Sequence, residues 1–266
     1  MTLPATQYWK VSEDQGAVRL TLARPALRNA LDAQTIQEGI ALIDALAARD
    51  DVRVIVLAGE GTHFCAGADL NYMKQMREAT EDQNIADAVK LGTLFHRIAT
   101  CPKPVVARVH GAAMGGGAGL VAAADVAVAT ADTAFAFTEV RLGIIPAVIS
   151  PYLIRRMGAA KMRRAVLTGY RFDAQEALRL GLVDALAPDE AELDRVVDGI
   201  VADFRAAGPK AVTAAKQLLD MVAGMSLENA GGETARRIAR IRTTPEAQEG
   251  MASFLEKRKP SWVAGS

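Results

Sequence analysis

The sequence predicts an α/β fold, and three observations lead to this prediction. Short apolar runs, several of them β-branched, alternate with segments of helical periodicity over residues 1–188. Two of these runs lead into glycine-bearing loops, at 66–69 and 115–119. The strand signals then stop, and residues 189–266 carry helical patterns alone. We therefore expect an α/β core over 1–188 and a helical region over 189–266.

The first part of the chain predicts strand, helix and strand. Val18 to Leu22 alternates between apolar and polar residues and predicts a strand that ends at Arg24-Pro25. From Ala33 to Ala48 apolar residues recur at helical spacing. Val52 to Ala58 is a continuous apolar run, typical of a strand buried on both faces, and it leads into the first glycine loop.

The same order recurs further along the chain. A polar helical stretch from Glu81 to Ala99 stops at Cys101-Pro102-Lys103-Pro104, because proline cannot extend a helix and restricts the residue before it. Val105 to Val109 predicts the next strand. The second glycine loop then opens an apolar segment, Leu120 to Ala124, and Asp125 to Ala129 resumes a strand. The unequal spacing indicates several turns of one α/β core rather than a sequence repeat.

The region after Pro188 predicts successive helices. Breaks at Gly208-Pro209 and at Thr243-Thr244-Pro245 separate them. The apolar faces of these helices exceed what a short appendage can bury on itself, so we expect them to pack on the core or on another subunit. The predicted helices are Glu190–Ala207, Pro209–Ala223, Leu227–Arg242 and Pro245–Lys257.

Composition and charge exclude several classes of protein. The chain has 266 residues, of which 50% are hydrophobic and 23% charged, and its formal net charge is zero. A chain of zero net charge has no long-range electrostatic field that would attract nucleic acid or an anionic membrane. The paired arginines at 155–156, 163–164 and 236–237 fall in helical patterns, where we expect solvated faces. The first residues lack an apolar signal core and no apolar run is long enough to span a bilayer, so we expect a cytoplasmic protein.

The cysteines and histidines predict neither disulfides nor a metal site. Cys65 and Cys101 lack the CxxC spacing of zinc or redox motifs, and two free thiols are typical of a reducing compartment. The spacing of His63, His96 and His110 is not that of a helical zinc pair, so we expect packing or surface roles for them.

The two glycine loops are the strongest functional signal from the residues alone. Glycine lets the backbone approach a ligand closely and turn its N–H groups toward it. Two such loops can direct two N–H donors at one oxygen, as an oxyanion hole requires, and a nearby carboxylate, Glu139, could then move a proton.

Each part of this signal also has a simpler interpretation. Gly115–Gly119 alone is compatible with a helix packed tightly on a strand or with a dinucleotide fingerprint, although its mid-chain position argues against the latter. Asp69 is placed to act as the N-cap of a helix that begins near Leu70.

Taken together, these segments resemble the crotonase superfamily of enoyl-CoA hydratases and isomerases. The resemblance covers nearly the whole chain and implies a core built as a ββα superhelix, which holds the active site over 1–188. It implies that the helical region over 189–266 mediates trimers, often paired into hexamers, and that the protein needs no metal and no cofactor beyond the coenzyme A of its substrate. The segments that carry it are Arg24-Pro25 with Asn29-Ala30-Leu31, residues 63–70, residues 110–117, residues 139–146 and residues 254–258.

The resemblance assigns catalytic roles to three positions. The backbone N–H groups of Ala68 and Gly116 would form the oxyanion hole for a thioester carbonyl, next to a helix that starts at 115–117. Glu139 matches a catalytic glutamate of the family, and burial should perturb its pKa so that it works at neutral pH. We expect that burial to come from the apolar residues Phe137, Val140, Leu142 and Ile144.

The resemblance also assigns the binding of the acyl-CoA substrate. Arg28 is a candidate contact for a CoA phosphate, or else a solvated loop arginine. Phe254 and Lys257 would reach the CoA of a neighbouring subunit, or else serve as a core and a surface residue. Ala66, Ala68 and Leu70 would line the path of the adenine and pantetheine groups. The full predicted binding set is Arg28, Ala66, Asp69, Leu70, Gly115, Phe254 and Lys257.

Two departures from the family pattern bear on the reaction. The best-known hydratases carry a second glutamate where this chain has Gly119. Glu139 would therefore have to orient the water and transfer the proton alone, or another group would have to help, and family isomerases share this single-carboxylate pattern. Residues 146–152 and 68–74 look more like the branch that hydrates methylglutaconyl-CoA and carboxygeranoyl-CoA, in leucine and acyclic-terpene breakdown, and that branch also tends to lack the second glutamate.

The sequence therefore predicts an enzyme that adds water across the 2,3 double bond of an enoyl-CoA thioester, with a branched or carboxylated acyl group as one option. Two alternatives stay open at this point. One is a Δ3,Δ2-enoyl-CoA isomerase that uses Glu139 as its base, and the other is an acyl-CoA-binding protein without turnover. A neutral chain without a basic, aromatic-rich face gives no support to nucleic-acid binding.

Overall fold

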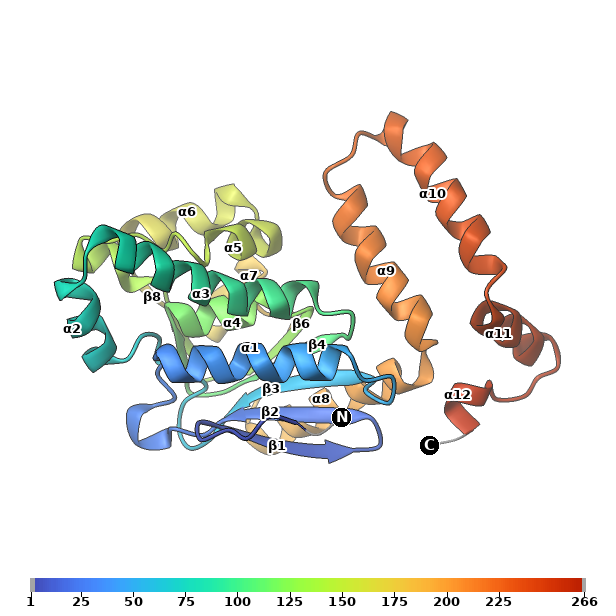
Figure 1. Cartoon of the computed structure of the whole chain (residues 1–266), viewed down its shortest axis with the longest axis horizontal. Coiled ribbons are helices and arrows are strands. Elements are labelled where there is room, and N and C mark those ends of the chain that lie inside the picture. The colour runs from blue at the N-terminus through green and yellow to red at the C-terminus, as the bar shows by residue number, and fades with distance from the viewer. Residues whose placement is uncertain (1–2, 265–266) are drawn as a thin grey trace.

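A six-stranded sheet forms the centre of the protein, whose computed structural model describes residues 3–264 (Figure 1). The strand order is β1-β2-β3-β4-β6-β9. β1 is antiparallel to β2 and all other neighbours are parallel, with Ala17 opposite Val54 and Ile55 opposite Val105. The strands are β1 (Trp9–Asp14), β2 (Ala17–Leu22), β3 (Val54–Gly59), β4 (Val105–Val109), β6 (Val126–Thr130) and β9 (Ala185–Ala187).

A second, three-stranded sheet lies beyond the carboxyl ends of the first. It consists of β5 (Ala112–Met114), β7 (Ala134–Ala136) and β8 (Arg171–Asp173), with β5 parallel to β7 and β7 antiparallel to β8. The chain passes from β4 into β5 and then into the helix α4 (Gly116–Ala123), and from β6 into β7 and then into helices. This repeated order of strand, strand and helix confirms the predicted ββα superhelix.

Alternating side chains of the parallel strands fill two separate cores. In β3, Ile55 and Leu57 belong to the larger core, together with residues of α1 (Ala33–Ala47) and α3 (Glu81–Thr100). Val54 and Val56 point to the other face, where they pack with Val197 of α8 (Glu190–Ala206). Strands buried on both faces explain why the sequence here is a continuous apolar run rather than an alternating one.

Further helices cover the core and extend the carboxyl-terminal region. All the helical segments predicted after residue 188 are present, with ends within a few residues of the prediction. The remaining helices are α2 (Leu70–Glu78), α5 (Ser150–Met157), α6 (Ala159–Thr168), α7 (Ala174–Leu180), α9 (Pro209–Val222), α10 (Leu227–Arg242), α11 (Pro245–Leu255) and α12 (Ser261–Ala264), with the 3-10 helices η1 (Pro25–Leu27) and η2 (Thr138–Leu142).

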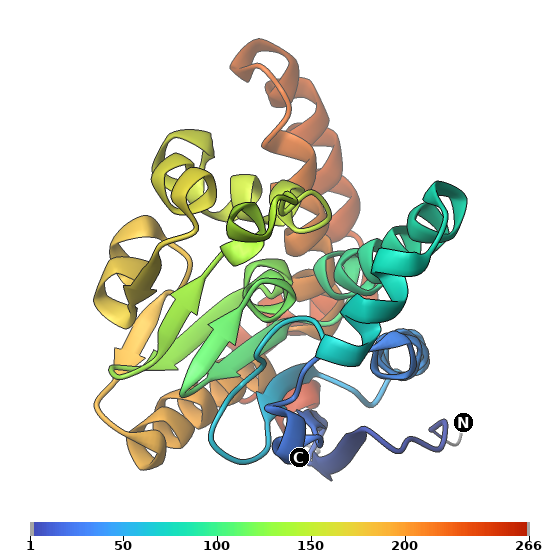
Figure 2. The same ribbon diagram turned by 90° about the vertical axis from the view of Figure 1, so that its left-hand side faces the viewer.

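The helices after residue 188 differ in how they pack. α8 covers one face of the six-stranded sheet, so this part of the predicted appendage packs on the core. Every residue of α9 and α10 remains at least partly exposed, and the two helices project from the rest of the chain in both views (Figures 1 and 2). The domain boundary at residue 188 stays a prediction.

Two details of the predicted fold need correction. The sequence analysis missed the edge strand β1, most of whose residues are polar and exposed, and the three-residue strands β5, β7, β8 and β9. Arg156 does not lie on a solvated face, since its side chain is only 9% exposed and pairs with Asp184. Cys65 and Cys101 are free thiols, as predicted, and both are buried.

Candidate active site

The two glycine loops lie side by side, although 45 residues or more of chain separate them. Cys65 forms a parallel bridge with Ala113. The amide of Cys65 donates to the carbonyl of Ala112 and the amide of Met114 donates to the carbonyl of Cys65, each at 3.0 Å. Gly67, with φ of +94°, lets the first loop approach so closely that a Cβ atom at this position would lie 2.9 Å from the Met114 carbonyl oxygen.

The direction of the Ala68 amide follows from its neighbours. Leu31 donates to the Gly67 carbonyl at 2.7 Å, and Asp69 donates to the Leu31 carbonyl at 2.9 Å. The N–H of Ala68 belongs to the same trans peptide group as the Gly67 carbonyl, so it points away from Leu31. Among residues 3–264, no acceptor for this N–H is present.

The second loop carries another amide without an acceptor among the described residues. Gly115 is the N-cap of α4 and has φ of +47° and ψ of −115°, a conformation that a residue with a side chain rarely adopts. Its amide donates to Ala136 at 2.9 Å. The next amide, that of Gly116, opens the first turn of α4 and has no acceptor within the described part of the chain. The helix dipole adds positive potential at this point.

Glu139 lies against this helix N-terminus. It belongs to η2, directly after β7, and a Cβ atom on Gly115 would be 3.2 Å from its Oε1. Its Oε2 is buried and has no hydrogen-bond partner in the described residues. Burial raises the pKa of the Glu139 carboxyl above its ordinary value. A buried acceptor without a partner is the kind of atom that an ordered water or a substrate group satisfies.

Two of the four apolar residues that we expected to bury Glu139 are themselves exposed. Leu142 and Ile144 are 61% and 53% exposed, so they do not enclose the carboxyl group in this chain. Phe137, by contrast, is fully buried.

Apolar side chains occupy the space beside Gly119. This residue lies within α4, where a Cβ atom would be 2.4 Å from Ile149 Cγ2 and 3.0 Å from Phe95 Cζ. Both neighbours are buried. A glutamate at this position would therefore have to displace core side chains, which explains physically why the second carboxylate is absent.

The predicted binding residues of the first loop lie around Ala68. Leu70, the first residue of α2, is 76% exposed, and Ala68 is exposed as well. Arg28 is also exposed, ends η1 with φ of +53°, and accepts the Ala66 amide at 2.9 Å through its carbonyl.

A cationic neighbourhood borders this face, and the sequence analysis missed part of it. The pKa of His63 is lowered by burial and by the nearby charges of Arg28, His110 and Arg171. Arg171 begins β8 and lies 143 positions after Arg28, so no local pattern could have revealed its place here.

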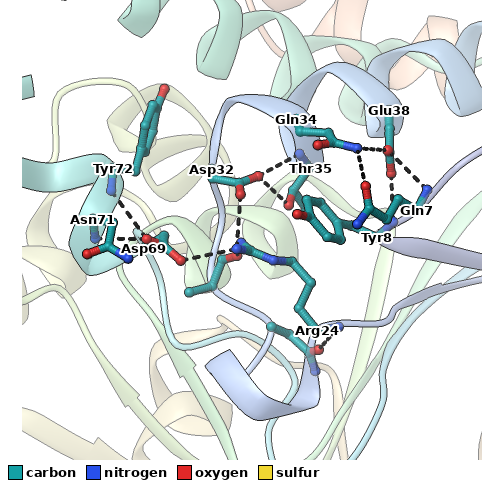
Figure 3. A network of polar contacts seen from close by, with 12 residues as sticks. Gln7, Tyr8, Arg24, Asp32, Gln34, Thr35, Glu38, Asp69, Asn71 and Tyr72 are labelled. Carbon is teal, nitrogen blue, oxygen red and sulfur yellow. Dashed lines mark hydrogen bonds and ion pairs between the residues drawn. The ribbon is translucent and has the colours of Figure 1, made fainter. Parts of the chain in front are cut away.

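Asp69 has a structural role, as its position predicts. It is the N-cap of α2, and its Oδ1 accepts the amides of Asn71 and Tyr72 (Figure 3). Its Oδ2 lies 3.2 Å from Nη2 of Arg24, and the residue is buried. The carboxyl group is thus engaged on both sides within the chain.

α11, which contains Phe254 and ends just before Lys257, lies at the opposite end of the molecule from α2 (Figure 1). Phe254 belongs to α11 and is 83% exposed, and Lys257 follows this helix with φ of +56°. Within one chain, the structure does not bring these two residues to the glycine loops.

The described residues provide neither a group of metal ligands nor a helix fit to span a membrane. No three His, Cys, Asp or Glu side chains of residues 3–264 come together in a way that could hold a metal ion. None of the helices found in these residues combines the length and the apolar character that crossing a bilayer demands.

Comparison with known proteins places the chain in a family. The sequence model described as "Enoyl-CoA hydratase/isomerase" matches residues 12–265. A putative enoyl-CoA hydratase of Thermus thermophilus is 35% identical over 251 residues, which are 94% of this chain and 99% of that protein.

Two further relatives agree with this match. The peroxisomal Delta(3,5)-Delta(2,4)-dienoyl-CoA isomerase of Arabidopsis thaliana is 30% identical over 260 residues, 94% of each chain. The crystal structure of an enoyl-CoA hydratase from Shewanella pealeana superposes with a TM-score of 0.93 at 37% identity and covers 96% of both chains. The chain therefore belongs to the enoyl-CoA hydratase/isomerase family, the crotonase superfamily.

Proposed function

We propose that the protein is an enoyl-CoA hydratase that adds water across the 2,3 double bond of a 2-enoyl-CoA thioester. One observation carries this proposal: a carboxyl group with a raised pKa lies against the N-terminus of α4, and its buried Oε2 and the amides of Ala68 and Gly116 have no partner within residues 3–264. We propose no cofactor besides the coenzyme A that the substrate itself brings.

The amides of Ala68 and Gly116 would bind the thioester oxygen. Attack at C3 moves electrons onto this oxygen as the enolate forms, so hydrogen bonds that strengthen with the charge lower the barrier. Each such donor typically contributes about 3–4 kcal/mol. The N-terminal end of α4 adds to the same field.

Glu139 would transfer the proton in both steps of the reaction. Its carboxylate takes a proton from water as the water oxygen bonds to C3 and the π electrons shift onto the thioester oxygen. When the enolate collapses, the carboxylic acid returns this proton to C2. Water has then been added and the carboxylate restored. The raised pKa makes the ionised form a stronger base than an exposed glutamate.

The packing around Gly119 supports a reaction with a single carboxylate. It also favours one alternative, a Δ3,Δ2-enoyl-CoA isomerase, in which Glu139 would remove a proton from C2 and return it to C4. We rank hydration first, because the relatives from Thermus thermophilus and Shewanella pealeana, at 35% and 37% identity, are named as hydratases, whereas the isomerase relative is 30% identical.

The CoA moiety would lie over the exposed residues around Ala68. Arg28 and Arg171 supply positive charge for its phosphates, and Ala66 and Leu70 supply apolar contact for the adenine and pantetheine groups. The branch suggested by residues 68–74 and 146–152 makes a branched or carboxylated acyl group, such as methylglutaconyl, the first choice to test.

We further propose a homotrimer or homohexamer. α9 to α11 expose large apolar side chains, with Leu219 68%, Leu227 95% and Leu255 79% exposed, which a second copy of the chain would cover. Phe254 and Lys257 would then reach the CoA of a neighbouring subunit.

A substrate panel tests the reaction. The purified protein is given crotonyl-CoA, methylglutaconyl-CoA and a 3-enoyl-CoA, and the absorbance of the conjugated thioester is followed. Its loss with the first two substrates indicates hydration, whereas its appearance with the third indicates isomerisation. If the protein binds these substrates saturably but converts none of them, the catalytic proposal is refuted and the alternative of an acyl-CoA-binding protein without turnover is supported.

Glu139→Gln is the matching variant, and Glu192→Gln is its control, at a half-buried carboxylate of α8 that pairs with Arg195 far from the glycine loops in sequence. The first should bind acyl-CoA normally and lose about 10²–10⁴-fold in turnover. The control should turn over at the normal rate. Near-normal hydration by Glu139→Gln would refute the assignment.

A further inference from the structure

One guanidinium joins the N-caps of two helices beside the candidate active site. The side chain of Arg24 is 9% exposed, and its Nη2 lies 3.0 Å from Asp32 Oδ2 and 3.2 Å from Asp69 Oδ2 (Figure 3). Asp32 is the N-cap of α1 and Asp69 that of α2. Arg24 therefore ties together the starts of two helices that are far apart in the sequence.

The two carboxyl groups divide their oxygens in the same way. Oδ1 of Asp32 accepts the amide of Thr35 at 2.8 Å, and Oδ1 of Asp69 accepts the amide of Asn71 at 2.8 Å. Oδ2 of each faces Arg24. Each carboxylate is thus held by its helix on one side and by the guanidinium on the other, which leaves it little freedom to turn.

The orientation of Arg24 is itself fixed by two further contacts. Its Nη1 donates to the Ala30 carbonyl at 2.5 Å, and its guanidinium carbon lies 4.5 Å from the centre of the Tyr8 ring. A planar group that stacks on a ring and donates in several directions has no equivalent in the point charge of lysine.

This network reaches the candidate oxyanion hole through adjacent peptide bonds. Asp69 directly follows Ala68, and Asp32 directly follows Leu31. Leu31 and Ala68 form the bridge that sets the direction of the Ala68 amide. Turning either carboxylate would therefore turn the segment that carries this amide.

We propose that Arg24 is a positioning residue: by holding Asp32 and Asp69, it aims the N–H of Ala68 at the thioester oxygen. This inference rests on the proposed function, since it takes the Ala68 amide to be an oxyanion donor. If Arg24 had a purely structural role, replacing it would lower the stability of the fold and leave the polarisation of a bound carbonyl unchanged.

The test compares Arg24→Lys with Arg156→Met. Arg156 is a matched control, because its side chain is also 9% exposed and also joins a carboxylate, that of Asp184, to backbone carbonyls, those of Leu182 and Ala124. These partners lie at the amino ends of β6 and β9, whereas the glycine loops lie beyond the carboxyl ends of β3 and β4. Asp69→Asn is a second variant, because asparagine keeps the N-cap but loses the charge that pairs with Arg24.

Two measurements are made on each protein. The first is the red shift of a bound 4-dimethylaminocinnamoyl-CoA, whose absorbance moves when hydrogen bonds polarise its carbonyl. The second is the separate determination of kcat and KM with the best substrate of the panel. We expect Arg24→Lys and Asp69→Asn to reduce the red shift and to lower kcat about tenfold or more, with KM changed by less than about threefold. Arg156→Met should lose stability and keep the red shift.

The outcomes separate this inference from the proposed function. A full red shift and a normal kcat in Arg24→Lys would overturn the role of Arg24 alone. A reduced red shift in a protein whose wild type turns over no substrate would support the role of Arg24 and refute the catalytic proposal. Failure of the wild type to bind the probe would overturn both.

Discussion

The carboxyl group of Glu139 packs against the backbone of Gly115, since a Cβ atom on the glycine would lie 3.2 Å from Glu139 Oε1. The contact joins the candidate base to the N-cap of α4, whose first free amide belongs to the next residue. The position of the carboxylate and that of the amide therefore depend on one residue without a side chain.

Replacing this glycine should damage activity more than stability. Gly115→Ala must adopt φ of +47° and ψ of −115°, which costs about 1–3 kcal/mol, and its methyl group would press on Glu139. Gly158→Ala is the control, because Gly158 has φ of +76° and nothing within 4 Å of its Cβ position. Urea unfolding should show a similar loss in both variants, while only Gly115→Ala should lose about tenfold or more in kcat. An equal loss of kcat in both would contradict this prediction.

The raised pKa of Glu139 predicts how activity depends on pH. As the proposed base, the carboxyl group must be ionised in the free enzyme. The value of kcat/KM should therefore fall with decreasing pH through a pKa above the ordinary value for glutamate. A pH profile of the purified enzyme measures this directly, and a flat profile across the range from the ordinary glutamate pKa to neutrality would be incompatible with it.

The same shift predicts an effect of Glu139→Gln on stability. The folded state holds the proton more tightly than the unfolded state, so wild-type stability is lost as the pH rises through the folded pKa. The glutamine variant has no charge to bury and should melt at a higher temperature than the wild type at neutral pH. This difference should vanish below the ordinary pKa of glutamate, and thermal melts at several pH values would show a constant difference if the prediction is wrong.

Crowding at Gly119 should make even a methyl group costly. Gly119→Ala would bring a Cβ atom 2.4 Å from Ile149 Cγ2, and overpacking of this kind costs about 1–3 kcal/mol. Gly92→Ala in α3 is the control, since its Cβ would lie 3.5 Å from Val148 Cγ1, an ordinary contact, and alanine favours a helix by about 1 kcal/mol. Adding Ile149→Ala should rescue part of the loss at 119, and strictly additive effects would argue against the contact.

The exposed apolar side chains of the carboxyl-terminal helices predict an assembly. Leu219→Arg, on α9, should convert the proposed trimer or hexamer into smaller species, because Leu219 is 68% exposed in the single chain. Leu167→Arg, on α6, alters a side chain of similar exposure, 64%, outside this region and should leave the mass unchanged. Light scattering after gel filtration measures both, and a monomeric wild type would refute the assembly.

Local sequence patterns predicted most of the fold for identifiable reasons. Val52 to Ala58 is apolar at every position but one, because β3 is buried between two layers of helices, and the helices after 188 carry apolar residues at a clear period. β1 was missed because only its first residue is buried, and β5, β7, β8 and β9 were missed because three residues are too few to show a period.

The site was only partly accessible from sequence. The loops and Glu139 stand out because glycines and a carboxylate in apolar surroundings are unusual. The exposure of Leu142 and Ile144 was not foreseen, since a single 3-10 turn has no periodicity that reveals which way it faces. Arg24 was noticed only as part of a motif, because its partner Asp69 lies 45 positions away and only the fold joins them.

The guanidinium of Arg24 contacts the N-cap aspartates of both α1 and α2, so we expect the first turns of these two helices to open together. Opening the first turn of either one withdraws its aspartate from Arg24 and leaves the other aspartate with a less firmly held partner. The amide protons of Thr35 and Asn71, which the two aspartates protect, should therefore exchange with deuterium in concert, as one small cooperative unit within the native protein.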